Sequence, residues 1–101
     1  MSIELVAVVR QVIRATDGLR VCLTSVDMIY PDGRDCGVPQ FVEGYEGASE
    51  LLIKFGVPAQ ELKEHYAQFQ KDSEVSIPLI ADEAVVRDMG FNPREQQSRE
   101  F

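Results

Sequence analysis

An Asp17-Gly18 dipeptide separates two segments rich in β-branched residues, and it constrains the fold more than any other feature of the chain. Asp-Gly between apolar runs favours a two-residue type I′ turn, because both central residues of that turn adopt positive φ. The apolar residues before the turn also fit helical spacing. The β-branched content and the turn favour strands over a helix, so we expect an antiparallel hairpin over residues 3–30.

The register of this hairpin follows from the position of its turn. One face should carry four apolar pairs: Ile13–Cys22, Val9–Val26, Ala7–Met28 and Leu5–Tyr30. The opposite face should carry three pairs with a polar member: Arg10–Ser25, Arg14–Val21 and Val8–Asp27. One apolar face and one more polar face predict a hairpin that helices cover on its apolar side.

The segment YPDGRDCGVPQ, residues 30–40, follows the hairpin and is rich in turn residues. Asp32 and Asp35 fit Asx-turn contacts, while the glycines and prolines delay the next helix. A reactive Cys36 would need a basic partner to lower its pKa, and Arg34 is the only one nearby. We interpret the segment as a structural connection; a catalytic or ligand-binding loop is the alternative.

Helical spacing begins at Tyr45, where an apolar stripe faces one way: Ala48, Leu51, Leu52 and Phe55. Gly56 should end this helix, and Pro58 suits the first turn of a second helix. The second helix should run to about Phe69, with four residues inward: Ala59, Leu62, Tyr66 and Phe69. Residues 71–73 should form a loop.

Val75, Ile77 and Leu79 lie at alternate positions of residues 75–80, which predicts a short strand that Pro78 would confine to a sheet edge. The alternative is a helix capped by Ser76 and continuing through Met89. We favour the strand, followed by a helix from Asp82 to Met89 that ends at Gly90. Phe91 can pack back onto this end of the fold.

The expected fold class is α+β: an N-terminal antiparallel β-hairpin, extended into a sheet of two or three strands and packed against two or three helices. Residues 1–93 should form this single domain, and residues 94–101 a mobile tail. Eleven residues should form the core: Leu5, Val9, Ile13, Val26, Met28, Leu51, Leu52, Phe55, Leu62, Tyr66 and Phe69.

The net charge of −7 is unevenly distributed. Acidic and basic residues balance over residues 1–34 and again from Phe91 onward, so the whole excess lies in the helical half. A solvated acidic surface and an acidic face for a basic partner both explain it. No apolar run is long enough to span a bilayer and the N-terminus lacks a basic secretion signal, so we expect a cytoplasmic protein and no membrane partner.

These observations favour a small acidic, non-enzymatic interaction module that has an accessory, regulatory or inhibitory role. Its partner should be another protein, with a basic surface. The candidate partner-binding residues lie on the two central helices: Glu43, Glu46, Glu50, Glu61 and Glu64. A homodimer through a sheet edge is a second candidate contact. Cys22, Cys36 and His65 are too few for a structural zinc site, and we expect no metal and no cofactor.

A DNA-binding regulator is the first alternative, since residues 48–69 resemble a helix-turn-helix. Its recognition helix would present Gln60, Glu61, Lys63, Glu64 and His65. Two carboxylates there would repel phosphates, so nucleic acid is the less favoured partner. A basic rim built by Arg10, Arg14 and Arg20 would restore the case for it.

A second alternative rests on the order of three segments along the chain: an Asp-Gly hairpin, a Gly/Pro loop, and Glu43-Gly44-Tyr45-Glu46 leading into a helix. This order resembles that of Nudix hydrolases, whose metal-binding helix carries an Arg-Glu followed by a Glu-Glu pair. The helix here reads SELLIKFG over residues 49–56, so most of those carboxylates are missing. The resemblance therefore implies a catalytically inactive Nudix-like domain.

Overall fold

A computed structural model describes residues 2–91 and has the α+β architecture expected from the sequence. The predicted tail, residues 94–101, and the predicted end of the domain at residue 93 lie outside the described residues. The first two strands, β1 (Ser2–Thr16) and β2 (Leu19–Ile29), form the expected hairpin. Asp17 and Gly18 take φ values of 51° and 79°, as a type I′ turn requires.

The predicted register of the hairpin is confirmed for three of its apolar pairs and for all three pairs of the opposite face. The fourth apolar pair, Leu5–Tyr30, does not form, because the β1–β2 pairing ends at Val6 opposite Ile29. Leu5 pairs instead with Leu79 on the other side of β1.

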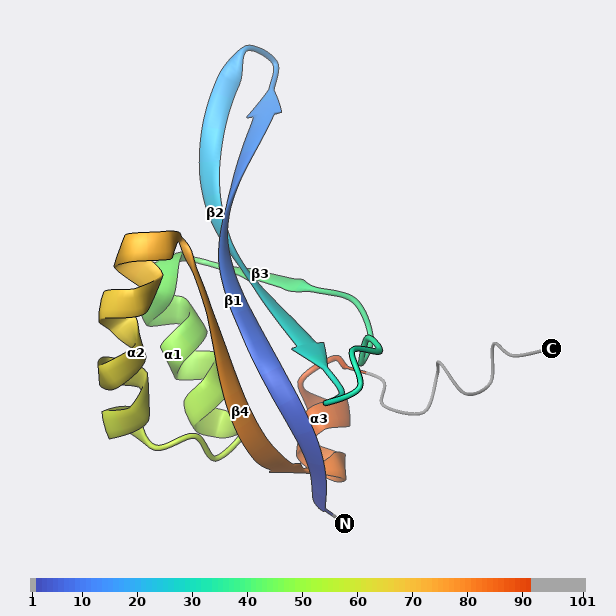
Figure 1. The fold of residues 1–101 in the computed structure, drawn as a ribbon. Helices are drawn as coiled ribbons and strands as arrows, with labels where there is room; N and C mark the ends of the chain where they lie inside the picture. Colours follow the sequence, from blue (N-terminus) through green and yellow to red (C-terminus); the bar gives the residue numbers. More distant parts are fainter. Residues whose placement is uncertain (1, 92–101) are drawn as a thin grey trace, which may run out of the picture.

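Two further strands complete an antiparallel sheet of order β3-β2-β1-β4 (Figure 1). Strand β4 (Glu74–Asp82) confirms the predicted strand and places Pro78 on an edge. Strand β3 (Gln40–Val42) makes the sheet one strand larger than the two or three expected. It pairs with only three residues of β2, from Thr24 to Val26.

Helices α1 (Gly44–Lys54) and α2 (Ala59–Asp72) lie together on one side of the sheet (Figure 1). Gly56, at φ 100°, follows the end of α1 as predicted. The prediction of a loop over residues 71–73 was wrong, since α2 continues to Asp72 and ends at Ser73 in the left-handed conformation. Helix α3 (Glu83–Asp88) begins after Asp82, whose carboxylate accepts a hydrogen bond of 2.8 Å from the Ala84 amide.

The core lies between the sheet and the helices, and it contains nine of the eleven predicted residues. Ile13 and Tyr66 were wrongly assigned to it, with exposed fractions of 61% and 43%. Ile13 lies on the expected face of β1 but beyond the region that the helices cover, whereas Tyr66 lies on the outer side of the helix pair. Phe91 packs back into the core, where its ring lies 5.8 Å from that of Phe55.

The connection after β2 buries Cys36 completely. Its amide donates a hydrogen bond of 2.7 Å to the Met28 carbonyl. The predicted Asx contact is present at Asp32, which accepts from the Arg34 amide at 3.0 Å and from the Arg34 guanidinium at 2.8 Å. Burial raises the pKa of the Cys36 thiol. Cys22 and Cys36 are both free thiols, and only Cys22 is exposed.

Candidate functional site

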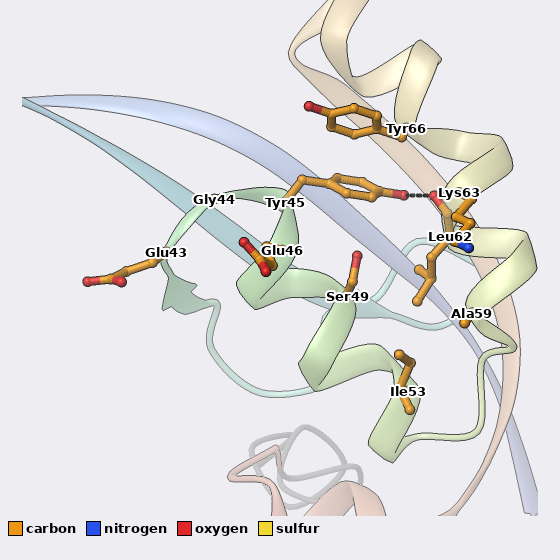
Figure 2. A pocket seen from close by; sticks show the side chains of 10 residues that line it. All are labelled: Glu43, Gly44, Tyr45, Glu46, Ser49, Ile53, Ala59, Leu62, Lys63 and Tyr66. Carbon is orange, nitrogen blue, oxygen red and sulfur yellow. Dashed lines mark hydrogen bonds between the residues drawn. The ribbon is translucent and has the colours of Figure 1, made fainter.

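A groove of about 630 Å³ runs between α1 and α2 on the side away from the sheet (Figure 2). We call it the α1–α2 groove. Its lining residues come from the start and outer side of α1 and from the facing side of α2: Glu43, Gly44, Tyr45, Glu46, Ser49, Ile53, Ala59, Leu62, Lys63 and Tyr66. The groove is within the size range of pockets that bind small molecules.

Tyr45 closes one end of the groove by joining the two helices. Its hydroxyl donates a hydrogen bond of 2.6 Å to the Leu62 carbonyl (Figure 2). Its ring lies 5.1 Å from the ring of Tyr66 and 5.0 Å from that of Phe69. Burial raises the pKa of the Tyr45 hydroxyl, so this group is a donor at neutral pH.

The apolar wall of the groove is solvent-accessible. Ile53 and Tyr66 are both exposed, although each is a large apolar or aromatic residue. Ala59 is exposed as well, while Leu62 is buried at the base. A cluster of accessible apolar side chains in a concave site is typical of a binding surface.

Two of the five predicted partner-binding residues, Glu43 and Glu46, line this groove, and Glu50, Glu61 and Glu64 do not. Glu43 and Glu46 are exposed, and neither forms an ion pair with any residue from 2 to 91. Lys63 supplies a positive charge on the α2 side of the same groove. The structure therefore places two of the predicted carboxylates on the α1 side of a groove that has exposed apolar side chains and, on its α2 side, one lysine.

Sequence reasoning missed most of the apolar part of the groove. Ile53 falls outside the inward stripe of α1, and its position on an otherwise polar side of the helix was the available signal. Tyr66 was placed in the core, because its spacing from Leu62 and Phe69 fits the inward face of α2. The contact between Tyr45 and Leu62 joins two helices, and spacing within either helix does not reveal it.

The three arginines of the hairpin do not assemble into one basic rim. Arg10 lies near two carboxylates, 3.8 Å from Asp27 and 3.3 Å from Glu74. Arg14 and Arg20 belong to neighbouring cross-strand pairs, so their side chains leave the hairpin on opposite faces. The helical hairpin expected over residues 48–69 is present, but the basic surface expected beside a DNA-binding helix is not formed by these three side chains.

Within residues 2–91, no three His, Cys, Asp or Glu side chains come together as they would around a metal ion. No helix in the same range combines the length and the apolar character that crossing a bilayer requires. The inactive Nudix-like domain stays a prediction. Comparisons with protein-family models, with curated proteins and with solved structures find no match for this chain.

Proposed function

We propose that this protein is a non-enzymatic interaction module of the cytoplasm that holds a short segment of another protein in the α1–α2 groove. The observation that carries the proposal is the combination of an accessible apolar wall, at Ile53 and Tyr66, with two carboxylates that have no ion-pair partner within residues 2–91. The matching ligand carries an apolar side chain beside a lysine or arginine.

The apolar wall is expected to provide most of the binding free energy. Burying one large apolar side chain contributes about 1.5–3 kcal/mol. An exposed ion pair at Glu43 or Glu46 contributes only about 0–1 kcal/mol, but it raises the association rate and rejects acidic competitors. Lys63 on the opposite wall disfavours a ligand that is basic on both sides. The preferred ligand is therefore amphipathic and basic on its α1 side.

The test is selection of binding peptides from a random library displayed on phage, followed by affinity measurements at low and high salt. We expect enriched peptides to share an aliphatic or aromatic residue next to Lys or Arg. Glu43→Lys with Glu46→Lys should weaken binding about tenfold, and the loss should shrink as salt screens the charges. Ile53→Ser should weaken binding at both salt concentrations.

The matched control is Glu50→Lys with Glu64→Lys, which makes the same change in net charge outside the groove. It should leave affinity within about twofold of the original, because these exposed side chains do not line the site. Equal losses from the two double variants would show that net charge alone matters. Selection of peptides without a shared apolar–basic pattern would overturn the proposal.

A further inference from the structure

The face of the sheet opposite α1 and α2 is largely exposed, although Ser25 on it is buried. It is formed by alternate residues of the strands: on β1 the even-numbered positions from Glu4 to Arg14, on β2 the odd-numbered positions from Leu19 to Ile29, on β3 Phe41, and on β4 the even-numbered positions from Glu74 to Ile80. We call it the open face. None of its β1 or β4 residues is buried, whereas Leu5, Ala7 and Val9 on the other face of β1 are fully buried.

The open face is more apolar than a solvated sheet face usually is. The run Leu5-Val6-Ala7-Val8-Val9 is apolar on both sides of β1, which is the pattern of a strand buried on both faces. Leu19 and Ile80 are 68% and 66% exposed on this face. Val21 and Phe41 are exposed there as well. Exposed apolar side chains therefore lie toward both ends of this face, and exposed apolar surface is a candidate contact site.

The tip of the hairpin extends this surface. Pairing with β4 ends at Arg10 and pairing with β3 ends at Thr24, so residues 12–23 project as a two-stranded arm (Figure 1). A two-stranded ribbon without a third strand or a helix against it is at best marginally stable in water. Leu19 and Val21 lie on the open-face side of this arm. A partner that covers the open face would therefore also stabilise the arm.

The sheet edges are less suited to pairing with another copy than the open face is. The Gln11 amide donates to the Ser73 carbonyl at 2.9 Å, and hydrogen-bonded pairs alternate along an antiparallel ladder. The backbone nitrogen of Pro78 is therefore directed away from β1, toward the free edge of β4. Because proline has no N–H group, this position cannot donate a hydrogen bond to another strand there. At the other edge, β3 is only three residues long.

We propose that a second copy of this chain packs its open face against this one, with the two β1 strands running in opposite directions about a two-fold axis. The charges at the two ends of β1 support a second copy in this orientation as the partner. Glu4 lies at one end of the open face and Arg14 at the other, roughly 30 Å apart along the strand. Neither forms an ion pair within the described part of the chain. Reversing the strand direction brings Arg14 of each copy to the end that holds Glu4 of the other.

The remaining charges of the open face are compatible with this arrangement. Arg10 lies near the middle of β1, where it pairs with Asp27 and Glu74 of its own copy. The apolar Val6 and Val12 are placed symmetrically about the middle of the strand. Val6 of each copy would therefore face Val12 of the other copy. Facing sheets pack about 10 Å apart. A two-fold contact uses the same surface on both copies, so the assembly it forms is a closed dimer.

The first measurement is the mass of the purified chain by sedimentation velocity over a range of concentrations. We expect reversible association from one copy of 11.3 kDa to two. Ile80→Glu should abolish association. Val38→Glu is the matched control, because Val38 is equally exposed, at 69%, but lies in the connection after β2. A chain that stays monomeric at every concentration would overturn the proposal.

The second measurement tests the strand arrangement by charge reversal. Glu4→Arg and Arg14→Glu should each weaken association about tenfold, since either change puts like charges at both ends of the interface. Together the two changes should restore it. Restoration cannot arise within one copy, because the two side chains are far apart along β1. Failure of the double variant to recover overturns the arrangement, provided circular dichroism shows the native fold. The Glu43→Lys, Glu46→Lys variant should still dimerise, so the groove and the dimer can fail independently.

Discussion

The hydroxyl of Tyr45 on α1 donates a hydrogen bond to the carbonyl oxygen of Leu62 on α2, across a distance of 2.6 Å. The ring of Tyr45 also packs against the rings of Tyr66 and Phe69 on α2. One side chain thus sets how α1 and α2 meet at the closed end of the groove. Stability and the shape of the candidate site depend on the same contact.

Tyr45→Phe should lower the free energy of unfolding by about 1 kcal/mol, because it removes this hydrogen bond and keeps the ring. Tyr66→Phe is the matched control, because its hydroxyl lies at the surface and accepts a hydrogen bond of 3.1 Å from the exposed side-chain amide of Gln70. The control should change stability by less than about 0.5 kcal/mol. Urea unfolding of the three proteins measures the difference. Equal losses would mean that the Tyr45 hydroxyl contributes nothing specific.

Tyr45 should also make stability depend on alkaline pH. Burial raises the pKa of its hydroxyl above the ordinary 10.0, so the unfolded chain loses this proton first. The stabilisation is therefore complete below pH 10.0 and is lost as the pH rises through the folded-state pKa. Stability measured between neutral pH and about pH 11 should fall less in Tyr45→Phe than in the original protein. Tyr30 and Cys36, whose pKa values are also raised, act equally in both. Parallel curves would contradict the prediction.

The hairpin was predictable because its determinants are local. Positive φ at Asp17 and Gly18 fixes the turn, and the turn fixes the register. The end of α1 was predictable for the same reason, at Gly56. The exposure of Ile13 was not predictable, since it depends on where the helices stop covering the sheet. Strand β3 has no local signature either, because three residues become a strand only by pairing with β2.

The candidate site was predictable only in its charge. The acidic excess pointed to Glu43 and Glu46, which do line the groove. Glu50, Glu61 and Glu64 share their residue type but face elsewhere. Which carboxylates meet an apolar wall is decided by the packing of α1 on α2, a tertiary relationship that spacing along each helix does not contain.

Phe91→Ala should lower the free energy of unfolding by about 3–5 kcal/mol, the usual cost of removing a fully buried phenylalanine. Phe91 is completely buried and contacts Phe55. Phe41→Ala makes the same truncation at an exposed side chain, and at concentrations where the chain is monomeric it should cost about 1 kcal/mol or less. Thermal or urea unfolding compares them. Similar losses would show that Phe91 does not belong to the cooperative core.

The two thiols should differ sharply in reactivity. Cys22 is exposed on β2, where its sulfur accepts a hydrogen bond of 2.7 Å from the Gln11 side chain. Cys36 is fully buried and its pKa is raised by burial, so little thiolate is accessible. An aromatic disulfide reagent should therefore label one thiol rapidly in the native protein and two in denaturant. Cys22→Ser should remove the rapid phase. Rapid labelling of Cys36 in that variant would show that the connection after β2 opens far more readily than its packing implies.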